Sequence, residues 1–188
     1  MNARNQVCFR LRCGLLIAVA ITMWISAVPI FAASTSDMTR PMANIQAGLG
    51  KLLDCHWLGN DLDAMCPIKQ IAGTLDLYRD PVGKSVESVE MTALVARHPK
   101  PRPDEEKLSR DTVLRIVAYL LPTWKNSSEW LTDVLHAAAR GRARKIIKIG
   151  GVTVLVQCVQ PADLEDAFAT IVITKKASLD DWKWDGDC

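Results

Sequence analysis

Apolar and polar side chains alternate along residues 152–160, and this period of two predicts a β-strand. One face of the strand is entirely apolar and is formed by Val152, Val154, Val156 and Cys158. We expect this face to lie in the core, because successive side chains of a strand point to opposite sides of its sheet. A shorter apolar run predicts a second strand at residues 144–149, and the two glycines between the strands predict a two-residue hairpin turn.

Four other segments give coarser predictions. Residues 85–96 and 166–175 are rich in β-branched and other apolar side chains and predict two further strands. Residues 68–78 fit either a strand or irregular structure. The segment at residues 55–67 contains a Gly-Asn-Asp run, which favours a loop or a short helical turn. Apolar residues at helical spacing predict a helix over residues 42–54.

Two more helices are predicted in the middle of the chain. Asp104 or Ser109 can cap the first, which ends before Pro122. Ser127 or Ser128 can cap the second, which ends at a glycine. Both helices are amphipathic, so this αα-hairpin must bury its apolar faces against another layer. We therefore predict an α+β fold: an N-terminal helix, then an αα-hairpin packed on a small, mainly antiparallel sheet, stabilised by disulfides.

The beginning of the chain predicts where the protein is located. Residues 14–30 form an uncharged apolar run that follows three arginines and precedes small residues. This order is typical of a secretory signal peptide. We expect residues 1–34 to be the signal peptide and residues 35–188 to form a single exported domain that is periplasmic or secreted. The alternative is a domain anchored by an uncleaved N-terminal helix, because a membrane span needs about 20 apolar residues.

The net charge changes once the predicted leader is set aside. The chain has 23 Lys and Arg and 21 Asp and Glu, and the leader holds three of the arginines and no acid. The remaining 20 basic and 21 acidic residues give a net charge of −1. This balance does not favour a nucleic acid as partner. We expect contact with a membrane only if the leader is not cleaved.

Four of the six cysteines lie outside the predicted leader: Cys55, Cys66, Cys158 and Cys188. An even number in an exported domain predicts disulfides. Three pairings are open, and we favour Cys55 with Cys66, which are close in sequence, and Cys158 with Cys188, which would otherwise lack partners. A zinc site is the alternative, but the chain contains no Cys-x-x-Cys spacing. We expect no metal and no other cofactor.

His56 is the best candidate for a catalytic residue. It follows Asp54 and precedes Asp61 and Asp63 in the predicted loop, so a His/Asp general-base pair is one interpretation. The other is a solvated loop histidine among carboxylates. No nucleophile or motif of a known reaction accompanies it, and the sequence therefore leans toward a protein that is not an enzyme.

Two groups of residues are candidate contact surfaces. The first is the densest cluster of one charge sign, formed by Arg140, Arg142, Arg144, Lys145 and Lys148. It can bind an anionic partner, or it can be a solvated strand edge next to a helix C-terminus. The second is the pair Trp182 and Trp184, which can contact a partner or cover the sheet.

Together these observations predict a small exported binding or accessory protein that acts through protein–protein contacts in the periplasm or cell envelope. An inhibitor-like or immunity-like role fits such a scaffold by analogy of architecture alone. The alternatives are an envelope-acting hydrolase that uses His56 with nearby aspartates, and a membrane-tethered module that carries a ligand.

Overall fold

A computed structural model describes residues 37–96, 100, 102–141, 144–159, 166–180 and 182. The predicted signal peptide at residues 1–34 lies outside the described residues. All described residues belong to one compact unit, which comprises residues 33–188.

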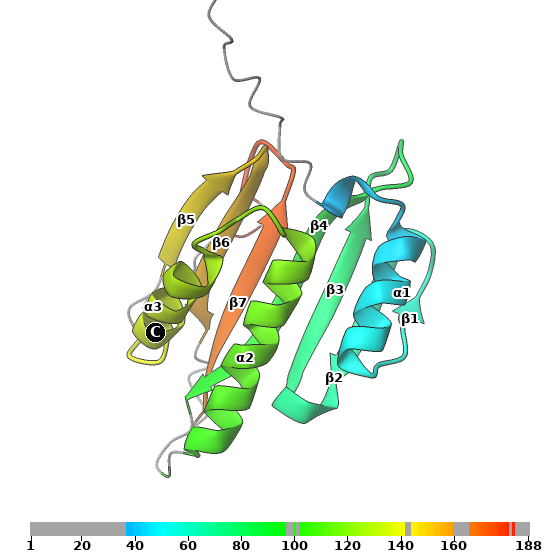
Figure 1. Ribbon diagram of the computed structural model, residues 1–188. Helices are drawn as coiled ribbons and strands as arrows, with labels where there is room; N and C mark the ends of the chain where they lie inside the picture. The colour runs from blue at the N-terminus through cyan, green and yellow to red at the C-terminus, as the bar shows by residue number, and fades with distance from the viewer. Residues whose placement is uncertain are drawn as a thin grey trace, which may run out of the picture. The chain divides into compact units, whose positions relative to one another are not determined.

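The strands of the described residues form one seven-stranded sheet, which is one layer of the fold (Figure 1). Its strands follow the order β1-β2-β3-β4-β7-β6-β5, and every neighbouring pair is antiparallel. The strands are β1 (Leu58–Gly59), β2 (Asp63–Ile68), β3 (Gly73–Arg79), β4 (Val86–Ala96), β5 (Arg144–Ile149), β6 (Val152–Val159) and β7 (Ala167–Thr174). Strand β7 inserts between β4 and β6, so the last of the described strands lies inside the sheet and not at an edge.

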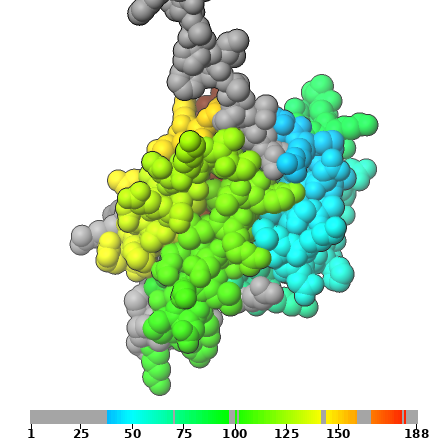
Figure 2. Space-filling view, in the orientation of Figure 1, coloured from blue at the N-terminus to red at the C-terminus, as the bar shows by residue number. Residues whose placement is uncertain are grey.

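The three α-helices of the described residues lie on one face of this sheet, and the space-filling view shows them covering that face (Figures 1 and 2). They are α1 (Met42–Leu53), α2 (Pro103–Leu120) and α3 (Ser127–Ala138), and two short 3-10 helices, η1 (Asp37–Thr39) and η2 (Lys69–Ile71), accompany them. Alternate strand residues point at the helices and form the core with them. The predicted apolar face of β6 is among them, and its four side chains are buried. The predicted α+β class is confirmed, but the sheet is larger than predicted.

The segment at residues 55–67 corrects the sequence prediction of a loop or helical turn. It contains β1 and most of β2, in which Ala64 and Cys66 are buried, as is Ile68 at the end of the strand. The short polar residues that favoured a loop occupy the turn between these two strands. Pro67 is tolerated because β1 pairs only with Ala64 and Met65, which leaves the Pro67 end of β2 as an edge.

The predicted caps of the two central helices are also wrong. The N-cap of α2 is Arg102, which makes no side-chain capping bond, and Pro103 occupies the first turn. Proline suits this position because its missing N–H would have no partner inside the helix. Ser109 is instead buried within α2. The N-cap of α3 is Asn126, again without a side-chain capping bond.

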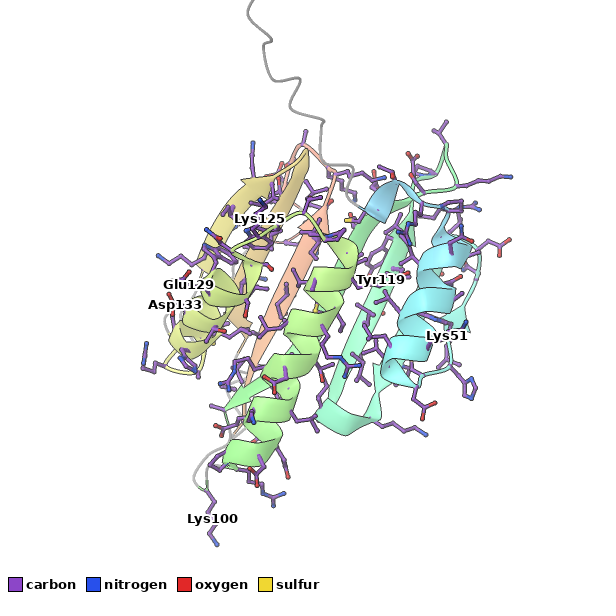
Figure 3. All side chains as sticks on the ribbon, in the orientation of Figure 1. Lys51, Lys100, Tyr119, Lys125, Glu129 and Asp133 are labelled. Carbon is purple, nitrogen blue, oxygen red and sulfur yellow. A yellow bond between two sulfur atoms is a disulfide. The ribbon has the colours of Figure 1, made fainter. Side chains whose placement is uncertain are left out.

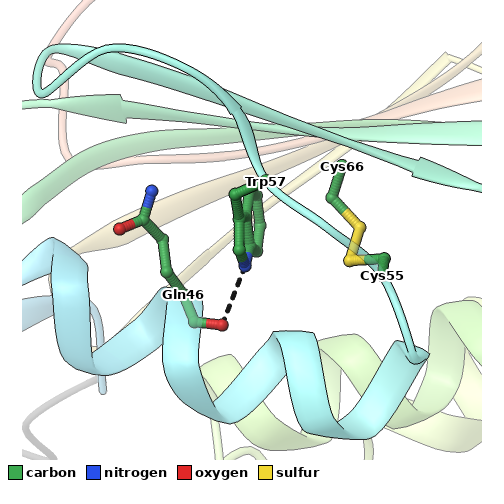
Figure 4. Close-up of a disulfide and its surroundings, with 4 residues drawn as sticks. All are labelled: Gln46, Cys55, Trp57 and Cys66. Atoms are coloured by element: carbon green, nitrogen blue, oxygen red, sulfur yellow. Dashed lines mark hydrogen bonds between the residues drawn. A yellow bond between two sulfur atoms is a disulfide. The ribbon is translucent and has the colours of Figure 1, made fainter.

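One disulfide joins the loop after α1 to β2 (Figure 4). Cys55 and Cys66 are bonded, as the sequence predicts, with their Cα atoms 6.0 Å apart. The Trp57 indole adds a second link, because its Nε1 donates a hydrogen bond of 2.9 Å to the carbonyl oxygen of Gln46 in α1. Cys158 is disulfide-bonded as well. Its predicted partner Cys188 lies outside the described residues, so that pairing stays a prediction.

Candidate binding surface

Strand β5 carries three of the five cations that the sequence groups together. Arg144, Lys145 and Lys148 are all exposed on this strand. Arg140 is also exposed and lies beyond the end of α3, whereas Arg142 is outside the described residues. Strand β5 is the last strand of the sheet, so its outer edge pairs with no other strand among the described residues. Three of the five clustered cations therefore form a cationic edge of the sheet.

The pairing with β6 divides these cations between the two faces of the sheet. Lys145 is opposite Val156, which is a core residue, and therefore lies on the helix-covered face. Arg144 is opposite Gln157, and Lys148 is opposite Thr153. These two cations thus lie on the second face, the one that the helices do not cover.

Ile146 lies between Arg144 and Lys148 on the second face, and 49% of its surface is exposed. Its cross-strand neighbour Leu155 is fully buried. Sequence analysis did not single out Ile146, because an isoleucine in a predicted strand is expected to be in the core. The alternation that places Val152 and Val154 in the core would have identified it, once the hairpin register was fixed.

The second face carries an acidic group on β3 and β4 that the sequence analysis missed. Asp76 and Glu90 are directly opposite each other on these strands. Burial raises the pKa of Asp76, and the negative charge of Glu90 raises it further. Burial and the carboxylates of Glu90, Asp76 and Asp63 also raise the pKa of Tyr78. The relevant sequence signal is a polar residue at every second position of both segments, but it becomes a cluster only when the strands are paired.

The C-terminal segment reaches this acidic group through a tryptophan. Trp182 Nε1 donates a hydrogen bond of 3.0 Å to Glu90 Oε2. The Lys176 ammonium lies 5.6 Å from the centre of the Trp182 ring, which is a cation–π distance. Trp182 is therefore engaged with the sheet of its own chain, in line with the alternative that the tail tryptophans cover the sheet. Trp184 lies outside the described residues, and its role as a partner contact stays a prediction.

Lys175 is a partly buried cation whose hydrogen bonds join neighbouring segments of the fold. Its Nζ donates hydrogen bonds to the carbonyl oxygen of Met38 at 3.3 Å and to Ser85 Oγ at 3.0 Å. Burial lowers the pKa of Lys175, while the carboxylates of Asp80 and Glu87 oppose that shift. The ammonium group thus connects the end of β7 to η1 and to the residue before β4. Nothing in the sequence pattern marks this position.

His56 is exposed, and within the described residues no hydrogen bond or ion pair joins it to Asp54, Asp61 or Asp63. Across the described part of the chain, no group of three or more histidine, cysteine, aspartate or glutamate side chains is arranged to hold a metal ion.

The outer side of α3 gives a useful contrast to β5. Glu129 and Asp133 lie there and are exposed, with Lys125 just before the helix (Figure 3). This surface has mixed charge and exposes no large apolar side chain, whereas β5 combines like charges with Ile146. Of these two surfaces, we therefore select β5 as the candidate binding surface.

None of the helices in the described ranges combines the length and the apolar character that are needed to cross a bilayer. Comparisons with protein-family models, with curated proteins and with solved structures gave no significant match.

Proposed function

We propose that this chain is a small exported binding or accessory protein that acts through a protein–protein contact, with β5 as its contact strand. The observation that carries this proposal is the outer edge of β5, where exposed Arg144 and Lys148 flank exposed Ile146 on one face of the sheet. The partner is expected to be acidic, because a cationic surface attracts carboxylates and disfavours cationic partners. Such a contact fits an inhibitor-like or immunity-like role.

A protected sheet edge is the competing explanation for the cations. Exposed lysines on edge strands disfavour association with apolar or cationic strands, and Lys145 and Lys148 fit that explanation. Edge protection does not require the half-exposed side chain of Ile146 between two cations. A single exposed apolar side chain is common on protein surfaces, and this one supports a contact because it lies between two like charges on the same face of the strand.

Export is the second part of the proposal. The Cys55–Cys66 disulfide supports it, because such bonds form and persist outside reducing compartments. The basic and apolar segments at residues 1–30 support it independently. We further propose that α1, followed by α2 and α3 as a helical hairpin, forms the layer that holds the sheet rigid behind β5.

Site-specific crosslinking in the producing cells tests the contact. A photoreactive amino acid replaces Ile146 in the full chain, and a matched variant carries it at Glu129 on the outer side of α3. We expect the variant at position 146 to crosslink one acidic protein, and the variant at position 129 not to do so. Combining the first variant with Arg144→Glu and Lys148→Glu should remove the product. Equal crosslinking at both positions, or none at position 146, would overturn the proposed contact.

Fractionation of the same cells tests export. We expect the chain in the periplasm or medium, without residues 1–34 and with Cys55 bonded to Cys66. An intact chain with reduced cysteines in the cytosol contradicts this part of the proposal.

A further inference from the structure

We propose that the partner binds by adding an antiparallel strand to the outer edge of β5, through an extended segment with the pattern acidic–x–apolar–x–acidic. This inference rests on the proposed function, because it specifies how the partner engages the same strand.

The turn between β5 and β6 fixes which backbone groups face outward. Gly150 and Gly151 have φ values of 53° and 86°, so both occupy the left-handed region that a two-residue type I′ hairpin turn requires. The residues that flank such a turn, Ile149 and Val152, are directly paired. In this type of hairpin the flanking residues exchange both of their backbone hydrogen bonds with each other.

The directions of the other backbone N–H and C=O groups of β5 follow, because these directions alternate from one residue to the next along a strand. Ile149 directs its N–H and C=O to β6, so Ile147 and Lys145 do the same. Lys148, Ile146 and Arg144 therefore direct their N–H and C=O groups away from β6, toward the outer edge. The three residues whose backbone faces outward are also the three whose side chains lie on the second face of the sheet. A strand added at this edge meets both sets of groups at once.

Cross-strand pairing then dictates the side chains of the partner. Residues directly opposite each other in an antiparallel pair have Cβ atoms about 5 Å apart, so their side chains interact. A carboxylate opposite Arg144, an apolar side chain opposite Ile146 and a carboxylate opposite Lys148 is the favourable combination. These positions are two residues apart in the partner, which gives the stated pattern.

A second copy of this chain does not satisfy the pattern. If two β5 strands paired antiparallel around Ile146, Arg144 of each copy would be opposite Lys148 of the other. Like charges directly opposite each other destabilise such a pair. The cations thus disfavour self-pairing in this register and favour a different, acidic chain.

The test is a titration of the full, oxidised chain with synthetic nine-residue peptides, in which binding is measured from changes in NMR chemical shifts. The probe contains the core Asp-Thr-Val-Thr-Glu, and a control peptide of the same composition contains Asp-Glu-Val-Thr-Thr. We expect the probe to bind about 3- to 5-fold more tightly than the control, since only the probe places both carboxylates opposite cations. If the probe does not bind, or if both peptides bind equally, the proposed pattern is wrong.

Charge variants test the faces of the strand. Arg144→Glu with Lys148→Glu should weaken probe binding by about 30-fold, because two attractive pairs become repulsive. Lys148→Glu alone should weaken probe binding by about 5-fold. Lys145→Glu is the matched control for this single change, because it makes the same charge change on the same strand but on the other face, and it should weaken binding by less than about 3-fold. Equal losses from Lys148→Glu and Lys145→Glu would show that only the net charge matters, and would overturn the assigned register.

Backbone variants test strand addition itself. Ile146→Pro removes an N–H group that faces outward, so the β5–β6 pairing should survive while probe binding falls by about 10-fold or more. A probe peptide N-methylated at the residues that face β5 tests the same bonds without changing the protein. If the charge variants weaken binding but the methylated peptide binds as well as the probe, strand addition is wrong and the proposed cationic contact stands.

Discussion

Removing the Cys55–Cys66 disulfide should destabilise the fold by an amount that the structure allows us to estimate. The bond closes a loop with a sequence separation of 11 residues. Restricting a loop of this length in the unfolded chain stabilises the native state by about 2.8 kcal/mol at 25 °C, from the dependence of loop entropy on length. We therefore expect the double variant Cys55→Ala, Cys66→Ala to lose roughly this free energy of unfolding. Alanine keeps the buried position of Cys66 apolar, so little of the loss should come from packing.

Urea unfolding measured by tryptophan fluorescence gives the free energy directly. The matched control is Trp57→Phe, which removes the hydrogen bond to Gln46 but leaves the disulfide in place. It should cost about 1 kcal/mol, the usual net contribution of one hydrogen bond. A loss of less than 1 kcal/mol in the cysteine variant, or one no larger than in Trp57→Phe, would refute the reasoning from loop entropy.

Three further changes have predicted directions. Asp76→Asn should stabilise the fold by about 0.5 kcal/mol at pH 7, because it removes a like-charge pair with Glu90. The pKa of Asp76 is raised in the folded chain, so its charged carboxylate destabilises the fold at pH values above that pKa, and this destabilisation disappears as the pH falls through it. The urea midpoints of the variant and the wild type should therefore converge below pH 3.8. Gly73→Ala should cost about 1–3 kcal/mol, because its Cβ would clash with the backbone carbonyl oxygen of Thr92, and unchanged thermal unfolding would contradict this. Trp182→Phe should cost about 1 kcal/mol through loss of the bond to Glu90, and an unchanged urea midpoint would count against that bond.

The sequence predicts the parts of the fold whose signals are local. The alternation at residues 152–160 and the two glycines before it identified the β5–β6 hairpin, and helical periodicity identified α1. Strands β1 and β2 were missed because turn-forming residues surround them and because Pro67 argues against a strand. Pro67 fits only because β1 is too short to pair beside it, which is a tertiary property that no local pattern contains.

The sequence predicted the candidate site only in part, as it did the fold. The cations of β5 were found because they are neighbours in sequence. Their division between two faces, and the role of Ile146, depend on the pairing of Arg144 with Gln157, which sequence alone does not give. Asp76 and Glu90 are separated by 14 positions in the printed sequence and become neighbours only through the β3–β4 register.

Amide hydrogen exchange, followed residue by residue by NMR with and without the acidic probe peptide, tests the assignment of β5 as the contact strand most directly. We predict that the amides of Lys145, Ile147 and Ile149 are already protected without peptide by their bonds to β6, and that the amides of Ile146 and Lys148 become protected only when peptide is added. If the amides of Ile146 and Lys148 exchange as fast at saturating peptide as they do without peptide, β5 does not bind its partner as proposed. The same conclusion follows if peptide slows the exchange of the other three amides instead.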